Sequence, residues 1–204
     1  MKLYFFPGAC SLSAQIALNE AGLPYEAVFA DIRSGRLSDG TDYRSINQLG
    51  YVPYLTLDNG DALHECATIA LYAADHAPDK KLAPAAGSSM ERYHFLELLN
   101  FVATELHKNF GPLFSPDTTD DLRIKVHERL KKRFDYINQL LDGKSWLTGD
   151  NFTVADGYLF AMCRWCQRLN VDLSSFANIL AWRERVAARP SVKAALQTEA
   201  AVKL

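Results

Sequence analysis

The chain has 204 residues, of which 49% are hydrophobic, enough for one large or two small globular domains with buried cores. Its formal net charge of −2 argues against nucleic acid or an anionic membrane as the main partner, and no apolar stretch approaches the length of a bilayer span. Four cysteines are too few for a disulfide framework and no signal peptide is evident, so we expect free thiols in the cytoplasm.

The first 80 residues alternate between strand and helix patterns. Asn59-Gly60 is the dipeptide that most favours a two-residue turn, and it predicts a hairpin between the third and fourth strands. The resulting order βαβαββα predicts an α/β domain with a mixed sheet and helices packed on it. The expected strands cover residues 3–6, 25–30, 55–57 and 62–64, and the expected helices cover 11–21, a short piece through residue 46, and 67–75.

A segment rich in Pro, Ala, Gly and Ser at residues 77–89 predicts the domain boundary, which divides the chain into 1–80 and 81–204. The second part has helical periodicity. In residues 121–141 the apolar side chains recur at steps of three and four, as on the buried face of a helix. We therefore expect an all-α second domain.

Cys10 follows the first strand directly after Pro7-Gly8 and stands at the start of the first helix. Unpaired N–H groups and the helix dipole favour an anion at that place, and they lower the pKa of a thiol. We expect a thiolate that attacks disulfides and electrophiles. Two alternatives remain: the N–H groups hold the thiolate of a bound thiol cofactor, or Cys10 simply fills the core.

Four segments of the chain, in the right order and covering essentially its whole length, resemble the bacterial beta class of glutathione transferases. They begin at residues 1, 50, 91 and 152 and read MKLYFFPGACSLSAQIAL, GYVPYLTLDNGDALHE, ERYHFLELLNFVATELHK and FTVADGYLFA. The resemblance implies a thioredoxin-like first domain, a helical second domain, a homodimer and glutathione as co-substrate. It also implies that Cys10 contacts the sulfur of glutathione and can form a mixed disulfide with it.

Other glutathione transferases activate the thiol with a Tyr near the end of the first strand or a Ser at the helix start. Here Phe5 and Phe6 end the strand and cannot donate a hydrogen bond. Ser11 and Ser13 could supply a hydroxyl, but both are equally good helix-starting residues. Cys10 is therefore the best candidate.

The resemblance also implies a binding site for glutathione. Only about 5–6% of X–Pro bonds in folded proteins are cis, so sequence alone favours a trans Val52-Pro53 bond. The family resemblance instead implies a cis bond. It also implies that the Val52 backbone pairs with glutathione like an added strand. Glu65 would take the γ-glutamyl amino group, although a helix-starting acid explains it as well. The implied glutathione-binding residues are Ala9, Cys10, Val52, Pro53, Glu65, Cys66 (through its N–H), Asn100, Thr104, Glu105 and His107.

Asn100, Thr104 and His107 are spaced four and three apart, which places them on one helical stripe. From the residues alone, such a stripe forms a hydrogen-bond network between helices or lines a cleft. The resemblance favours the cleft between the domains and places His107 near the sulfur, as a second catalytic residue that stabilises a thiolate or moves a proton. We expect no metal, because the adjacent residues of the His64–Cys66 run rarely converge on one ion.

Two further motifs are interpreted as structural. Cys163 and Cys166 have CxxC spacing, but no strand precedes them and they lie within a helical pattern, so we predict no redox function there. Thr153 and Asp156 form the pattern of a capping box. Gly157 stands where the resembled family has a bulkier residue, so we expect no hydrophobic staple with the preceding phenylalanine.

The chain departs from the family pattern at its glutathione site. Gly35 and Leu49 stand where lysines are common, and Cys66 stands where Gly or Ser is usual. A charge-assisted hydrogen bond contributes about 1.5–3 kcal/mol, so the loss of one predicts roughly tenfold weaker binding.

The leading prediction is a glutathione transferase that conjugates glutathione to small hydrophobic electrophiles in detoxification. Thiol–disulfide exchange or peroxide reduction through Cys10 is a second activity. The alternative is a non-catalytic protein of the same fold that binds a ligand or a partner protein.

Overall fold

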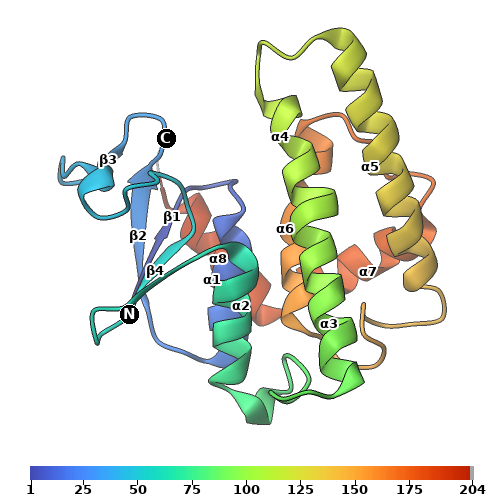
Figure 1. Ribbon diagram of the computed structural model, residues 1–204, viewed down its shortest axis with the longest axis horizontal. Helices are drawn as coiled ribbons and strands as arrows, with labels where there is room; N and C mark the ends of the chain where they lie inside the picture. Colours follow the sequence, from blue (N-terminus) through green and yellow to red (C-terminus); the bar gives the residue numbers. More distant parts are fainter. Residues whose placement is uncertain (203–204) are drawn as a thin grey trace.

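The computed structural model describes residues 1–202, which form an α/β part followed by a helical part (Figure 1). One mixed sheet has the strand order β3-β2-β1-β4-β5. β1 pairs in parallel with β2, whereas the β1–β4, β4–β5 and β2–β3 pairs are antiparallel. The strands are β1 (Lys2–Phe5), β2 (Glu26–Asp31), β3 (Arg36–Leu37), β4 (Tyr54–Thr56) and β5 (Ala62–His64).

The expected mixed sheet and hairpin are confirmed, with Tyr54 opposite His64 and Thr56 opposite Ala62. The short edge strand β3 was not among the expected strands. A 3₁₀ turn over Tyr43–Ser45 corresponds to the short helical piece expected there.

The expected all-α second part is confirmed, with one irregularity between α3 and α4. The residues Val102–His107 form a π-helix, in which each turn contains an extra residue, so side-chain directions shift from those of an ideal α-helix. A second 3₁₀ turn covers Pro78–Lys80. The helices are α1 (Ser11–Ala21), α2 (Cys66–Asp75), α3 (Met90–Phe101), α4 (Lys108–Phe114), α5 (Asp120–Leu140), α6 (Val154–Arg168), α7 (Ala177–Ala187) and α8 (Pro190–Ala200).

α1 lies at the centre of the molecule. In Figure 1, α1 and α2 stand between the sheet and the helices of the second half, and α1 contacts α2, α6 and α8. Because neighbours surround it, most of its residues are buried, including the polar Ser11, Ser13 and Gln15. The start of α1, where Cys10 lies, is therefore held from several sides.

Gly157 of α6 packs directly against Ile16 of α1. A Cβ atom added to it would lie 2.9 Å from Cγ2 of Ile16, closer than real side chains approach. Glycine therefore permits this contact, at a cost of up to about 1 kcal/mol in helix propensity. Phe152, which has no staple partner at Gly157, packs its ring against Trp146 and the Arg189 guanidinium instead.

The capping box at the start of α6 is built around the fully buried Asp156. Its Oδ2 accepts hydrogen bonds from the backbone N–H of Thr153 at 2.9 Å and from the Thr153 hydroxyl at 3.1 Å. Its Oδ1 accepts from the N–H of Leu147 at 3.0 Å and from Trp182 Nε1 at 2.8 Å. Asp156 thus ties α6 both to α7 and to the segment after α5.

Within residues 1–202, none of the helices combines the length and the apolar character that a membrane crossing requires.

Candidate functional site

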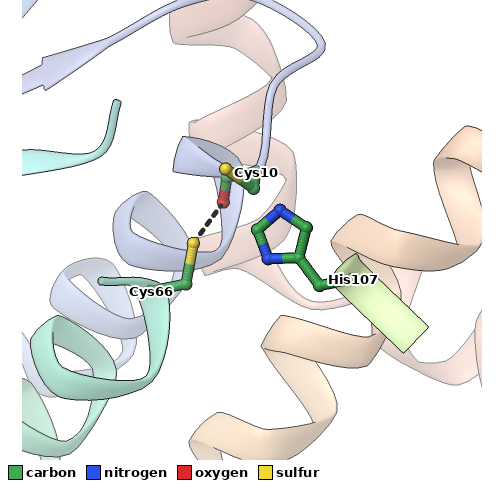
Figure 2. A group of neighbouring side chains, drawn as sticks. All are labelled: Cys10, Cys66 and His107. Atoms are coloured by element: carbon green, nitrogen blue, oxygen red, sulfur yellow. Dashed lines mark hydrogen bonds between the residues drawn. The ribbon is translucent and has the colours of Figure 1, made fainter. Parts of the chain in front are cut away.

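Three side chains that are distant in the sequence meet where the two parts of the chain face each other (Figure 2). Cys10 is the N-cap of α1, Cys66 is the first residue of α2, and His107 ends the π-helical segment. One donor atom from each, the two Sγ atoms and a ring nitrogen, all lie within 4.8 Å of one another. The starts of two helices thus point at one place, and an imidazole faces them.

Cys10 is half-buried, and its Sγ donates a hydrogen bond to the carbonyl oxygen of Val52 at 3.3 Å. Its side chain caps no N–H group of α1. A hydrogen bond with Cys66, burial and the nearby Cys66 charge raise the pKa of the Cys10 thiol well above its ordinary value. The expected lowering of this pKa by the helix start is therefore wrong, because the neighbouring Cys66 thiol and burial raise it.

Cys66 is 2% exposed and lies on the buried side of Cys10. Its Sγ donates a hydrogen bond to the Cys10 carbonyl oxygen at 3.5 Å, the dashed line in Figure 2. The sequence analysis assigned only the backbone N–H of Cys66 to the site. The proximity of its side chain to Cys10 could not be read from two positions so far apart in the chain.

His107 is oriented by Tyr158 of α6, whose hydroxyl oxygen lies 2.6 Å from Nδ1. Burial, with a smaller contribution from the Lys108 charge, lowers the pKa of His107 to about 4, so the imidazole is neutral near pH 7. A neutral imidazole carries its proton on one nitrogen and accepts at the other. If the Tyr158 hydroxyl accepts a hydrogen bond from Nδ1–H, then Nε2 carries no proton and can take one up. If the hydroxyl instead donates to Nδ1, then Nε2 carries the proton and its N–H can stabilise a thiolate.

Tyr158 was missed by the sequence analysis, which interpreted its segment as a folding element. A buried tyrosine hydroxyl needs a hydrogen-bond partner, and this is the signal that could have marked it. Its partner, however, lies 51 positions away.

The cis Val52-Pro53 bond that the resemblance implied is present, and it turns the Val52 carbonyl oxygen towards Cys10. Glu65 has a φ of 67°, an unusual backbone conformation for a residue other than glycine. Its Oε1 accepts a hydrogen bond from the Tyr51 hydroxyl at 3.1 Å. The carboxylate is thereby held at the exposed side of the site.

The loop before Cys10 is contacted by two residues of the second half of the chain. Trp165 Nε1 donates a hydrogen bond to the carbonyl oxygen of Gly8 at 2.8 Å. Glu199 of α8 is 6% exposed; burial raises its pKa to about 7, while the N–H of Gly8 and the charge of Arg164 oppose that rise. Ala9, between Gly8 and Cys10, is half-buried, and its N–H bonds to the Phe6 carbonyl oxygen at 3.0 Å.

Of the polar stripe, only His107 lies in this group of three. Asn100 and Thr104 are exposed, and the Thr104 hydroxyl donates to the Asn100 carbonyl oxygen at 3.0 Å. Glu105 accepts a hydrogen bond from Arg133 Nε at 2.6 Å. The π-helix thus interrupts the regular stripe that α-helical spacing predicts.

The cations that flank Gly35 are engaged within their own loop. Arg33 Nε pairs with Asp31 at 3.0 Å and Arg36 Nη1 donates to the Gly40 carbonyl oxygen at 2.9 Å. Leu49, where a lysine is common, is 59% exposed. The weaker binding of glutathione expected from these departures stays a prediction.

The free cysteines form two groups, Cys10 with Cys66 and Cys163 with Cys166. The two sulfurs and one nitrogen of Cys10, Cys66 and His107 are ligand types that bind soft metal ions. The expected absence of a metal stays a prediction.

Cys163 and Cys166 are buried in α6. Burial raises the pKa of Cys163 to about 12 and that of Cys166 further, which leaves both thiols protonated.

Comparison with known proteins gives consistent matches over the whole chain. The family model described as the N-terminal domain of glutathione S-transferase matches residues 8–76, and that described as the C-terminal domain matches residues 101–190. Glutathione S-transferase GstA of Escherichia coli O157:H7 is 43% identical, with 98% of both chains covered. Glutathione S-transferase GST-4.5 of Xanthomonas campestris pv. campestris is 37% identical, also with 98% of both covered.

Solved structures agree with these matches. The ternary complex of BphK, a bacterial GST, superposes with a TM-score of 0.94 at 45% identity, covering 98% of this chain and 100% of that one. A sphingomonad glutathione S-transferase complexed with glutathione gives a TM-score of 0.93 at 40% identity, covering 99% of this chain and 100% of that one.

Proposed function

Since the chain belongs to the glutathione S-transferase family and is an enzyme of that family, we propose that it binds glutathione where Cys10, Cys66 and His107 meet and conjugates it to small hydrophobic electrophiles. The observation that carries the proposal is the meeting of two helix starts beside the cis Val52-Pro53 bond. Backbone N–H groups there favour the thiolate and a carboxylate of glutathione. A sphingomonad relative has been solved with glutathione bound, which supports the choice of ligand.

In the proposed complex, the Val52 backbone pairs with the cysteinyl residue of glutathione like an added strand. The Cys66 N–H, at the start of α2, binds the γ-glutamyl carboxylate, and Glu65 binds the neighbouring amino group. On the family resemblance alone, the proposal adds Ala9, Pro53, Asn100, Thr104 and Glu105 to the residues that contact glutathione.

The proposed reaction needs the thiol of glutathione as its thiolate. His107 is neutral and can take the thiol proton at Nε2 while Tyr158 holds Nδ1. The thiolate sulfur then forms a bond to the electrophilic carbon, and a leaving group departs with its electron pair or the adduct takes up a proton. Conjugation gives His107 a role in the reaction, whereas the alternative, a non-catalytic binding protein, does not require this residue.

We also propose a mixed disulfide at Cys10. The Cys10 thiolate attacks glutathione disulfide, forms a bond to one sulfur and releases the other glutathione as a thiolate. The same Cys10 thiolate would attack a peroxide oxygen, which breaks the O–O bond, releases an alcohol or water and leaves Cys10 as a sulfenic acid. One glutathione then forms the mixed disulfide with loss of water, and a second glutathione restores the thiol and leaves as glutathione disulfide.

Titration calorimetry with glutathione, together with a conjugation assay on a chloronitrobenzene, tests the proposed function. Binding and turnover are expected, both in the unaltered protein and in the control Cys163→Ala, whose site lies within α6 away from Cys10. An enzyme that binds glutathione without turning over any such electrophile contradicts the substrate class. Absence of glutathione binding contradicts the site itself.

The homodimer is proposed from the family. Tyr93 and Met90 of α3, which are 51% and 63% exposed, are large apolar side chains that a second copy of the chain could cover. Sedimentation velocity at micromolar concentration should give the mass of a dimer, and a monomer would contradict the proposal. Cell fractionation with a cytosolic marker tests the proposed cytoplasmic location.

A further inference from the structure

We infer that Cys66 is a second redox-active thiol, which resolves the Cys10–glutathione mixed disulfide by forming a Cys10–Cys66 disulfide. The inference rests on the proposed function, because glutathione and its disulfide supply and receive the electrons. In this reaction the thiols of Cys10 and Cys66 act together, and the substrates are low-molecular-weight disulfides.

The first support is the distance between the two thiols. Both cysteines are free, and their sulfur atoms lie within 4.8 Å of each other. The Cys66 sulfur also lies 3.5 Å from the Cys10 carbonyl oxygen, so it is in contact with the residue it would bond. A disulfide places its two sulfurs about 2.05 Å apart, so the inference requires the two side chains to move closer together than they are here.

The second support is the difference in exposure, which sets the order of the steps. Cys10 is half-buried and accessible from the outer side, whereas Cys66 is 2% exposed and lies behind it. Glutathione disulfide therefore reaches Cys10 first. Cys66, whose sulfur lies within 4.8 Å of the Cys10 sulfur, then attacks the mixed disulfide from within the protein.

The third support is the position of both cysteines at helix starts. Cys10 precedes α1 and Cys66 begins α2, so each thiolate would lie next to unpaired N–H groups. Once Cys10 is bonded to glutathione, its sulfur carries no charge. The second thiolate then forms without a charged neighbour, and its proton passes to the departing glutathione thiolate.

The two steps balance in atoms and electrons. Cys10 thiolate attacks glutathione disulfide, the Cys10–glutathione S–S bond forms, and one glutathione leaves as thiolate. Cys66 thiolate attacks the Cys10 sulfur, the Cys10–Cys66 bond forms, and the second glutathione leaves. The dithiol loses two electrons and two protons, and glutathione disulfide becomes two glutathione molecules; the reverse sequence restores the dithiol.

A bound metal ion is the other use for this set of donors, and the electrostatics disfavour it. Two helix starts direct their positive ends at the two sulfurs, which favours anions over a cation. The test is nevertheless run on protein treated with a chelator, so that an ion cannot occupy the thiols.

The test incubates reduced protein with excess glutathione disulfide, quenches with acid and maps the products by mass spectrometry. The unaltered protein should lose two hydrogen atoms and give a Cys10–Cys66 cross-linked peptide. Cys66→Ala should stop with one glutathionyl group on Cys10, at a level at least roughly tenfold higher than in the unaltered protein, because an internal thiol acts at a high effective concentration. Cys163→Ala, the matched control, should behave like the unaltered protein.

A second arm uses diamide without glutathione, which closes neighbouring dithiols regardless of glutathione binding. A Cys10–Cys66 cross-link is expected, and its absence overturns the inference. A stable glutathionyl group on Cys10 of the unaltered protein, equal to that in Cys66→Ala, also overturns it while leaving the proposed function intact. Absence of any adduct on Cys10 in Cys66→Ala contradicts the proposed mixed disulfide and, with it, this inference.

Discussion

The Sγ of Cys10 donates a hydrogen bond to the carbonyl oxygen of Val52, 3.3 Å away, at the residue that precedes the cis proline. This contact joins the start of α1 to the segment expected to pair with the backbone of glutathione. A thiol that donates a hydrogen bond is protonated. In this arrangement Cys10 is a thiol, the less nucleophilic form, and its proton is directed at the Val52 carbonyl oxygen.

The first prediction concerns the pH dependence of Cys10 alkylation without glutathione. The neighbouring Cys66 thiol and burial raise its pKa above the ordinary value of 9.0, so the alkylation rate should rise only at a pH above that value. Cys66→Ala should move the profile to lower pH because it removes the first of these causes. Peptide mapping of the alkylated protein measures the rate. An unchanged profile in Cys66→Ala would assign the shift to burial alone.

The second prediction separates two roles of Cys10. Cys10→Ala should abolish the glutathione adduct and disulfide exchange, because the covalent partner is gone. Conjugation should survive in part, because the N–H groups at the start of α1 still hold the thiolate of glutathione. Both activities are measured on the same preparation. Equal loss of both would show that the Cys10 sulfur is also required for conjugation.

The third prediction concerns His107. His107→Ala should lower kcat for conjugation roughly hundredfold and change glutathione affinity much less, because a proton acceptor acts mainly as charge develops. Tyr158→Phe removes the hydroxyl that orients Nδ1, so it should lower kcat to a smaller extent. Steady-state kinetics and calorimetry give the two quantities. Equal losses in kcat and binding would indicate a structural role for His107.

The fourth prediction concerns the stability of the second half of the chain. Asp156→Ala leaves the four hydrogen-bond donors around the buried carboxylate without their acceptor. The free energy of unfolding should fall by about 3–5 kcal/mol. Denaturant titration measures it, with the exposed Asp150→Ala as the control that should change little. A loss below about 1 kcal/mol would contradict the role given to Asp156.

The fifth prediction follows from Glu199, whose pKa is raised from 4.5 to about 7 by burial. Because the folded state holds the proton more tightly than the unfolded state, the contribution of Glu199 to stability is full below pH 4.5 and is lost as the pH rises to about 7. The whole loss corresponds to about 3 kcal/mol. Glu199→Gln should show less of this decline in unfolding experiments across that pH range. Parallel curves for the two proteins would contradict it.

Features encoded locally were predictable from the sequence. The Asn59-Gly60 hairpin, the start of α1 at Cys10 and the capping box each depend on residues within a few positions of one another. The cis Val52-Pro53 bond followed from the family and not from the local propensity, which favours trans. What local patterns did not reveal was the set of contacts made by folding, such as Cys66 with Cys10 and Tyr158 with His107.

The direction of the Cys10 pKa shows the physical reason for this limit. The helix start is a local feature, and by itself it predicts a lowered pKa. The opposing influence comes from Cys66, which begins a different helix 56 positions later and is visible only when both helices are packed together. Likewise, the π-helix over Val102–His107 interrupts the expected polar stripe, but this segment contains no glycine or proline from which the irregularity could have been predicted.

The contact between Gly157 and Ile16 has a consequence for how the two halves of the chain can be recombined. A chimera that joined the first half of this protein to the second half of a relative with a larger residue at position 157 would force that side chain against Cγ2 of Ile16. The two positions therefore have to be inherited as a matched pair. Although the sequence divides into two domains, the contact between Ile16 and Gly157 joins one half to the other, and an exchange of halves at the linker would separate these two residues.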